Sequence, residues 1–158
     1  MYSILFKEIE DEKELKKLKE FMLLNPEFYP EKIYKPWIDE KCVPRIESNI
    51  YKTIISFSEN KVIGNLVWRY LDNNQIEIKN LRVKKSNRGR DIGHFMLTQM
   101  EKDNPKCSII TDVTINNLSM INFLIRNGYE ITSKENIYIP NQYECILEKH
   151  PKTIRPKI

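Results

Sequence analysis

The sequence of 158 residues is long enough for one domain with a buried core, and its 41% hydrophobic and 30% charged residues argue against an intrinsically disordered chain. Three cysteines without CxxC spacing and two widely separated histidines argue against a disulfide framework or a zinc site. The net charge of +4 comes partly from a basic C-terminal tail, and no apolar run reaches the roughly 18 residues of a membrane span, so we expect a cytoplasmic protein.

The N-terminal part of the chain, residues 1–49, predicts one strand followed by helical segments. Residues 2–9 are expected to form the strand, and residues 11–24 have the apolar spacing of a helix. Residues 28–49 contain three prolines, which predicts short helical pieces and turns rather than one long helix.

The middle of the chain predicts three strands joined by short turns into an antiparallel meander, at residues 50–57, 62–71 and 75–83. After them come a helix at 90–103, a strand at 107–114, a helix at 117–127 and two strands at 129–133 and 142–147. This order predicts an α+β domain whose central sheet of about seven strands is mixed, mostly antiparallel and flanked by about four helices.

The strand at residues 75–83 changes its apolar alternation halfway along. Ile76 and Ile78 share one face, whereas Leu81 and Val83 share the other. A one-residue β-bulge at position 79 or 80 would bring all four side chains to one face, and bulges often lie beside active sites. A strand buried on both faces is the alternative.

Residues 88–93, Arg-Gly-Arg-Asp-Ile-Gly, follow this strand and open the next predicted helix. A basic turn with glycines at a helix N-terminus offers backbone N–H groups and arginine donors to an anion such as a pyrophosphate. The spacing matches neither a P-loop nor a dinucleotide-binding GxGxxG motif. The alternative is a tight turn without an anion site, because such a turn would need the same two glycines.

The sequence here resembles the GNAT superfamily of acetyl-CoA-dependent N-acyltransferases. Arg88 and Gly93 match its Arg/Gln-x-x-Gly-x-Gly/Ala signature, with Asp91 in place of the middle glycine, and Asn117 and Tyr129 align with a second family segment. The resemblance covers most of residues 50–147, and it implies acetyl-CoA as cosubstrate and a bulged, splayed strand whose backbone pairs with the pantetheine arm. The cofactor-binding residues that it implies are Leu81, Arg82, Val83, Arg88, Gly89, Arg90, Asp91, Ile92, Gly93, His94 and Asn117.

Acetyl transfer needs a base for the amine, a donor to the carbonyl and an acid for the thiolate. Glu77 and Asp112 match family positions for the base, although each could be a solvent-facing carboxylate or an ion-pair partner. The family's acid, a tyrosine, is replaced by Leu124, which cannot donate a proton. A backbone N–H at Val83 or its neighbour is expected to polarise the carbonyl, and Asn117 could be simply a helix N-cap.

The acceptor side is expected to come from residues 1–49, where Tyr29, Tyr34 and Trp37 either line the cleft or pack as core. We expect a single domain over residues 1–158, with a cofactor-binding core at 50–147 and a basic tail at 148–158. The partner is expected to be a small-molecule or peptide amine, nucleic acid is not expected, and a homodimer is left open. A non-catalytic acyl-CoA-binding regulatory domain is the alternative function, and a nucleic-acid-associated module is a weaker one.

Overall fold

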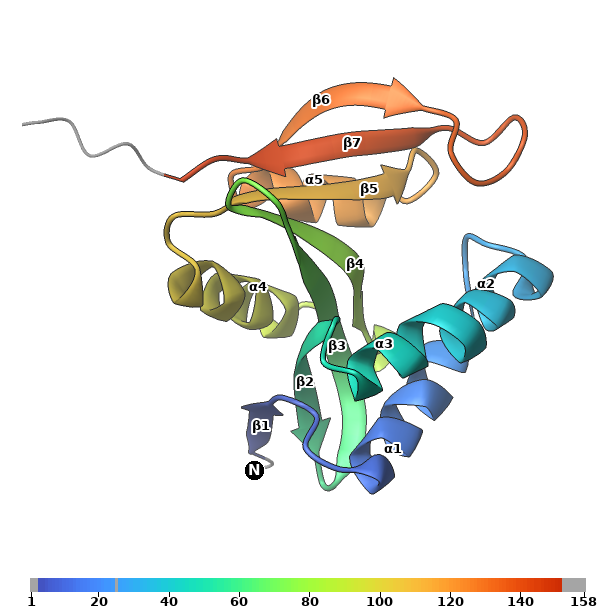
Figure 1. Ribbon diagram of the computed structural model, residues 1–158, viewed down its shortest axis with the longest axis vertical. Helices are drawn as coiled ribbons and strands as arrows, with labels where there is room; N and C mark the ends of the chain where they lie inside the picture. Colours follow the sequence, from blue (N-terminus) through green and yellow to red (C-terminus); the bar gives the residue numbers. More distant parts are fainter. Residues whose placement is uncertain (1–2, 25, 152–158) are drawn as a thin grey trace, which may run out of the picture.

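The computed structural model describes residues 3–24 and 26–151, so Tyr2 of the predicted first strand and residues 152–158 of the predicted basic tail lie outside the described part. These residues form one seven-stranded sheet in the order β1-β2-β3-β4-β5-β7-β6 (Figure 1). The strands are β1 (Ile4–Lys7), β2 (Lys52–Ser58), β3 (Lys61–Leu71), β4 (Gln75–Val83), β5 (Ser108–Thr114), β6 (Glu130–Glu135) and β7 (Glu144–Lys149).

The sheet is mixed and mostly antiparallel, as the sequence predicted. Strands β2, β3 and β4 form the expected meander through short turns, and β4 pairs with β5 in parallel. The remaining pairs in the described chain, β1 with β2 and β7 with both β5 and β6, are antiparallel. The α+β prediction is therefore confirmed.

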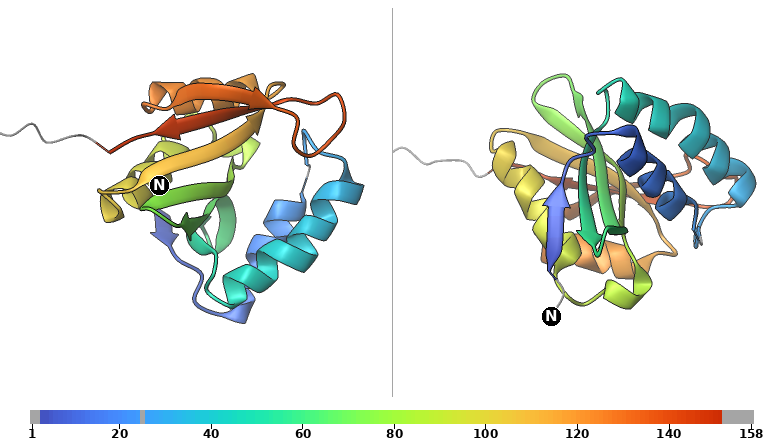
Figure 2. Two further views of the ribbon diagram at one scale, coloured as in Figure 1. Left: turned by 45° about the horizontal axis from the view of Figure 1, so that its top comes forward. Right: turned by 90° about the horizontal axis from the view of Figure 1, so that it is seen from below.

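Helices cover both faces of this sheet (Figure 2). The N-terminal helices pack on one face, and the later two pack on the other. The first group comprises α1 (Glu12–Leu23), α2 (Glu31–Trp37), the π-helical turn η1 (Ile38–Cys42) and α3 (Val43–Glu47), and the second comprises α4 (Ile92–Asp103) and α5 (Leu118–Arg126). Within residues 3–24 and 26–151, no helix is long and apolar enough to cross a membrane.

Helix α1 begins and ends as its sequence indicates. The Asp11 carboxylate accepts a 2.8 Å hydrogen bond from the Glu14 N–H and caps the first turn. Leu18 and Met22, one turn apart, are 0% exposed and pack against β2 and β3. Burial of this apolar stripe fixes the helix on the sheet.

The prediction that residues 28–49 form separate helical pieces was wrong. Helices α2 and α3 run into one another through η1 without a break (Figure 1). The Val43 N–H donates to the Ile38 carbonyl five residues earlier, so the backbone widens just before Pro44. This π-helical turn lets the helix continue past the missing N–H of the proline.

Burial explains why the helix is kept in spite of its prolines. Ile38, Cys42 and Ile46 recur every four residues and are all buried against α1 and the sheet. Burying two isoleucines and a cysteine contributes several kcal/mol, whereas a proline within a helix costs about 3 kcal/mol. Tertiary packing therefore outweighs the local cost.

The β-bulge predicted in β4 is present, and Lys79 is its extra residue. Val67 of β3 pairs with Asn80, but the next residue, Trp68, pairs with Ile78. The pairing therefore skips Lys79, which is one of the two positions, 79 or 80, where the sequence predicted the bulge.

The bulge brings both halves of β4 to the same core. Ile76 and Ile78 are buried in the apolar cluster under α4 and α5, and Leu81 and Val83 pack against that same cluster. The apolar side chains of β4 thus lie on one face despite their change of parity.

Candidate active site

Strands β4 and β5 part beside the bulge, and this parting defines the site. Their pairing runs from Gln75↔Ser108 to Glu77↔Ile110, and no later pair joins the two strands in the described chain. Figure 1 shows β4 turning away from β5 beyond this point. The second half of β4 therefore presents backbone groups toward an opening in the sheet, as expected from the resemblance.

The turn after β4 leads to the N-terminus of α4 with an open glycine. Gly89 has a φ of +83°, and a Cβ built there would have no described atom within 4 Å. The Arg88 Nε donates a 3.0 Å hydrogen bond to the Val83 carbonyl, and its Nη2 lies 3.4 Å from Glu27 Oε1. Arg88 is thereby fixed beside the turn, with Arg90 exposed next to it.

Asp91, the departure from the family signature, occupies a glycine-like position. Its φ of +61° and ψ of +17° lie in the left-handed region. Its side chain makes no cap bond to α4 among the described residues, and the first helical bond runs from the Phe95 N–H to the Asp91 carbonyl. The N–H groups at the start of α4 can thus be offered to an anion.

Three other predicted cofactor residues have structural partners in or near α5. A Cβ on Gly93 would lie 3.2 Å from Phe123 Cζ, so the missing side chain lets α4 approach α5. His94 Nδ1 lies 2.6 Å from Asn127 Oδ1 at the end of α5. Asn117 accepts a 3.2 Å hydrogen bond from the Met120 N–H, which confirms it as the N-cap of α5.

Arg82 performs a structural task that the sequence did not reveal. Its Nη1 donates to the carbonyls of Phe21 (3.3 Å) and Met22 (3.1 Å), and its Nη2 donates to the Leu24 carbonyl. The guanidinium also lies 5.3 Å from the Phe21 ring centroid. The last turn of α1 has no basic residue of its own. Arg82 therefore supplies the positive charge that interacts favourably with the free carbonyl groups at the C-terminus of α1.

A pocket of about 430 Å³ lies on the other side of the parting, on the sheet face opposite α4 and α5. It is lined by Glu77, Ile110, Thr111, Asp112, Thr132, Ser133, Glu135, Ile137, Tyr138, Ile146 and Glu148. Both predicted candidates for the base are in this set. No cluster of three or more histidine, cysteine or acidic side chains in the described part is placed to hold a metal ion.

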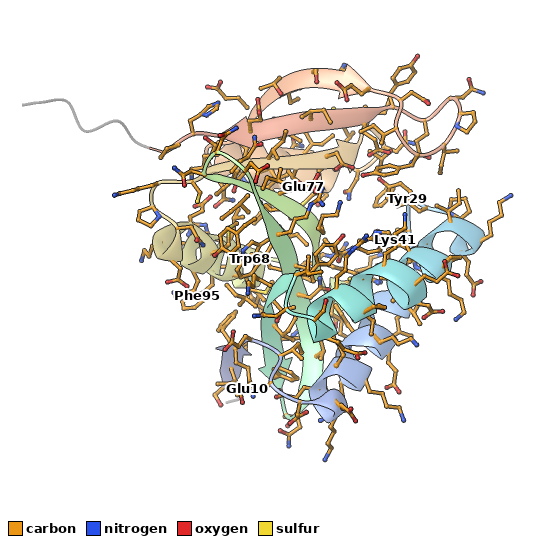
Figure 3. All side chains as sticks on the ribbon, viewed as in Figure 1. Glu10, Tyr29, Lys41, Trp68, Glu77 and Phe95 are labelled. Atoms are coloured by element: carbon orange, nitrogen blue, oxygen red, sulfur yellow. The ribbon has the colours of Figure 1, made fainter. Side chains whose placement is uncertain are left out.

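Glu77 is held by two cations. Its Oε1 accepts a 2.7 Å hydrogen bond from Arg69 Nε and a 3.2 Å bond from Lys79 Nζ. Lys79 is the bulged residue, so the bulge places this ammonium beside the pocket. Figure 3 shows Glu77 where β4 and β5 separate.

Asp112 lies in a less polar position on β5. Burial raises the pKa of its carboxyl above the usual value of 3.8, against the lowering effects of a hydrogen bond from the Tyr138 hydroxyl and of the Lys79 charge. A buried aspartate with one hydroxyl donor has a stronger tendency to take up a proton. The structure therefore brings Glu77 and Asp112 together in one pocket with different electrostatic surroundings.

Glu144 is a buried carboxylate on β7 near this pocket, although it does not line the pocket, and the sequence analysis did not identify it. Tyr29 donates a 2.9 Å hydrogen bond to Glu144 Oε2, and the Tyr29 ring meets the Tyr138 ring edge-on at 6.0 Å. Glu144 is 0% exposed, and burial raises the pKa of its carboxyl. Strand alternation gave one signal, because Glu144 lies two residues from Ile146 and so on the same face of β7.

The other aromatic candidates, Tyr34 and Trp37, lie on α2. The Tyr34 hydroxyl accepts a 3.5 Å hydrogen bond from Asn80 Nδ2, just after the bulge. The rings of Tyr34 and Trp37 stack at 6.2 Å, and Trp37 packs against the core under α1. Tyr29 and Tyr34 are thus bonded to Glu144 and Asn80, Trp37 mainly supports Tyr34, and none of the three is among the residues that line the pocket.

Leu124, at the position of the family's acid, is 1% exposed within the core under α4 and α5. Tyr129 is also buried there, and its hydroxyl donates a 2.9 Å hydrogen bond to Glu101 Oε2. Neither side chain is an acid at the parting of the strands.

The residues after β4 fit a diphosphate group. The space around Gly89, the start of α4 and the side chains of Arg88 and Arg90 together offer backbone N–H donors, a helix dipole and two cations. The Asp91 carboxylate is the one unfavourable charge in this turn.

No protein-family model matches the sequence, and no curated protein matches it significantly. Solved structures do match the fold. The PaiA N-acetyltransferase from Thermoplasma acidophilum, in complex with coenzyme A, is 21% identical, with a TM-score of 0.75 over 94% of this chain and 99% of that one. Naa50 from Arabidopsis thaliana, in complex with the bisubstrate analogue CoA-Ac-MVNAL, is 23% identical, with a TM-score of 0.63 over 93% and 98%.

The ribosomal-protein-S18-alanine N-acetyltransferase from Escherichia coli is 11% identical, with a TM-score of 0.75 over 99% of both chains. These similarities extend over nearly the whole chain, including residues 1–49, where the sequence resemblance was confined to element order. Together with the bulged, parting strand β4, they show that this protein has the fold of the GNAT N-acetyltransferases.

Proposed function

We propose that the protein transfers the acetyl group of acetyl-CoA to an amine. The observation that carries the proposal is the parting of β4 from β5 at a bulge, directly before a glycine-containing turn and the N-terminus of α4. This arrangement offers an open strand edge and an anion site in sequence, as a molecule with an extended arm and a diphosphate requires. Structures of the same fold that contain coenzyme A support the proposal.

The turn and helix start would hold the diphosphate, through Gly89, the first N–H groups of α4 and the two arginines at 88 and 90. The backbone of residues 81–83 would pair with the pantetheine arm. The side chain of Arg82 is engaged with α1, so its contribution comes through its backbone. Bound acetyl-CoA supplies the thioester as acyl donor.

Asp112 is the better base of the two candidates. An amine attacks only as its neutral form, so the base must accept a proton near neutral pH. Burial raises the pKa of Asp112, whereas Glu77 is already engaged by Arg69 and Lys79. We therefore assign proton removal to Asp112, with Glu77 held beside it by Arg69 and Lys79.

A backbone N–H near Val83, on the free edge of β4, would donate to the carbonyl oxygen as negative charge develops there. The thiolate would take its proton from solvent, because Leu124 is buried and carries no proton donor. Loss of a positioned acid costs about 100-fold to 10,000-fold in rate, but a thiolate is a good leaving group. A slow enzyme is the expected result.

Calorimetry with acetyl-CoA and a thiol-release assay with a panel of amines test the proposal. We expect binding at one site and release of coenzyme A with at least one amine. The absence of acetyl-CoA binding would contradict the proposal altogether. Binding without turnover on any amine would support the non-catalytic acyl-CoA-binding alternative, for which the buried Leu124 is the relevant observation.

A further inference from the structure

The strand register places Lys79, the bulged residue of β4, next to Asp112 on β5. The ladder between the two strands ends at Glu77, and the Thr111 hydroxyl then donates a 3.4 Å hydrogen bond to the Ile78 carbonyl. Because β4 and β5 run parallel, the next step along both strands leads to Lys79 and Asp112. The bulge therefore inserts a lysine at the position beside the proposed base.

Lys79 is the inner of two cations that bind Glu77. Glu77 Oε1 lies 2.7 Å from Arg69 Nε and 3.2 Å from Lys79 Nζ. The side chain of Arg69 is 40% exposed, whereas that of Lys79 is 17% exposed. Two positive charges on one carboxylate leave one positive charge unbalanced, and a poorly exposed charge needs a partner. Asp112, at the next step of the register, carries the negative charge that balances it.

The uncharged neighbours of Asp112 and Lys79 are two tyrosines and a cysteine. Burial raises the pKa values of Tyr29 and Tyr138, which lie near Asp112, so both hydroxyls keep their protons at neutral pH. Burial also raises the pKa of Cys42, near Lys79, to about 12, so its thiol is neutral as well. These side chains therefore supply no charge that could balance Asp112 in place of Lys79.

The other titratable groups around Asp112 are acidic. Glu144 lies two residues from the β7 partner of Asp112, and the charges of the two carboxyls act on each other. The pocket lining adds Glu135 of β6 and Glu148 of β7, and no lysine or arginine of the described chain is part of that lining. Each of these carboxylates disfavours the ionised form of Asp112. Lys79 is the cation that lies next to Asp112 in the register and opposes them.

Resting on the proposed acetyl transfer, we propose that Lys79 is a positioning residue that keeps the Asp112 carboxylate ionised, ready to take the proton of the acceptor amine. A buried carboxyl without a nearby cation holds its proton more strongly and is then no base at neutral pH. An ammonium acts on it through its charge and does not have to touch the acceptor or the thioester. The lowering effect of the Lys79 charge on the pKa of Asp112 has this direction.

The test measures kcat against pH with one amine that the parent acetylates, so that the ionisation of the amine is the same for every variant. In Lys79→Met, the acid limb of the profile should move to higher pH by about one unit, because loss of the cation raises the pKa of Asp112. Above the displaced limb, kcat should return close to the parent value, since Asp112 itself is unchanged. Lys79→Arg should keep the parent limb because its guanidinium preserves the charge. Calorimetry should show the parent affinity for acetyl-CoA in both variants.

A second variant, Glu77→Gln, should move the acid limb in the opposite direction, to lower pH, because the Glu77 carboxylate opposes the ionisation of Asp112. A general loss of packing would not shift the limb in opposite directions in these two variants. Lys102→Met is the matched control, since it removes an exposed ammonium from α4, and it should keep the parent limb. Thermal unfolding of every variant checks that it is folded.

NMR titration of the Asp112 carboxyl carbon decides the matter without turnover, with Asp112→Asn to assign the signal. We expect a midpoint below neutral pH in the parent and a midpoint about one unit higher in Lys79→Met, or in Lys79→Gln if the methionine variant does not fold. A parent midpoint above neutral pH would contradict the inference, because Asp112 would then not be kept ionised.

An unmoved limb or midpoint in Lys79→Met, or an equal shift in Lys79→Arg, would overturn this inference and leave the proposed acetyl transfer intact. Failure of acetyl-CoA to bind the parent would instead overturn the proposed function. The NMR titration would still decide in that case whether Lys79 sets the charge of Asp112.

Discussion

The hydroxyl of Tyr29 donates a 2.9 Å hydrogen bond to Oε2 of Glu144, two residues that are 115 positions apart in the chain. The bond joins the segment before α2 to the start of β7, and Gln142 Nε2 adds a 3.4 Å bond to the Phe28 carbonyl. Figure 3 shows Tyr29 beneath the loop between β6 and β7. These two bonds tie the segment before α2 to the region around the start of β7.

Removing the Tyr29 hydroxyl should destabilise the protein. In Tyr29→Phe, the buried Glu144 carboxyl loses the hydrogen bond from the Tyr29 hydroxyl, and such a loss costs about 1–3 kcal/mol of unfolding free energy. Urea denaturation measures the change. Tyr143→Phe, on a half-exposed side chain of the loop between β6 and β7, is the control and should change stability little. Equal stability of the two variants would show that the bond contributes nothing.

Glu144→Gln should become more stabilising, relative to the parent, as the pH rises. Burial raises the folded-state pKa of Glu144 above its ordinary 4.5, so the folded protein binds more protons than the unfolded chain above that pH. The free energy of unfolding of the parent therefore falls as the pH rises through this window, and a neutral amide removes that fall. Denaturation curves at about pH 4.5 and about pH 8 measure it. Glu130→Gln, at an exposed position on β6, is the control variant.

Asp112→Asn should lower kcat strongly and leave acetyl-CoA affinity nearly unchanged. Loss of a general base costs about 100-fold or more, and Asp112 lies on the acceptor side of the parting. Glu77→Gln should also slow turnover more than it alters cofactor affinity. Its loss of kcat should be smaller than that of Asp112→Asn. Because the pKa of Asp112 is raised, the parent's kcat should fall toward acid pH as this carboxyl is protonated, and the asparagine variant should lack that limb. Unchanged turnover would remove Asp112 from the mechanism.

Asp91→Gly should bind acetyl-CoA at least as tightly as the parent. The substitution removes a carboxylate from the anion site, and glycine adopts the left-handed φ of +61° without the cost of roughly 1 kcal/mol that a β-carbon brings. Calorimetry measures the affinity. Asp72→Gly, which removes the same charge from the turn between β3 and β4, is the control. Weaker binding of Asp91→Gly than of this control would mean that Asp91 makes a favourable contact with the ligand.

Arg82→Met should destabilise the protein by about 1.5–3 kcal/mol, because hydrogen bonds from a charged donor to the end of α1 are lost. Arg82→Lys should recover only part of this loss, since an ammonium lacks the planar fork that reaches several carbonyls at once. Thermal unfolding measures both variants. Lys85→Met, at an exposed position after β4, serves as the control, and a similar effect there would contradict a specific role for Arg82.

The features that the sequence predicted correctly depend on local patterns. The switch of alternation between Ile78 and Leu81 located the bulge, because side chains in a strand must alternate between two faces. The apolar spacing of α1 and the N-cap at Asn117 are equally local. Such patterns can be read from neighbouring residues without knowing the partner element.

The features that sequence reasoning missed depend on contacts across the chain. The continuous helix through Pro36 and Pro44 is kept by burial against α1 and the sheet, which a local proline rule does not include. The pairing of Tyr29 with Glu144 and the capping of α1 by Arg82 join distant segments. No spacing in the sequence reports contacts of this kind.

The extra residue at position 79 turns β4 into two half-strands of opposite phase. Before Lys79, odd-numbered side chains such as Glu77 point to the sheet face that carries the pocket. After Lys79, even-numbered side chains such as Asn80 and Arg82 point to that same face, where they contact the N-terminal helices. In the proposed reaction, a side chain replaced in the first half would change what the acceptor contacts, whereas the second half would contribute through its main chain. In the proposed reaction, one inserted residue thus separates the half of β4 whose side chains line the pocket from the half whose backbone would pair with the acyl donor.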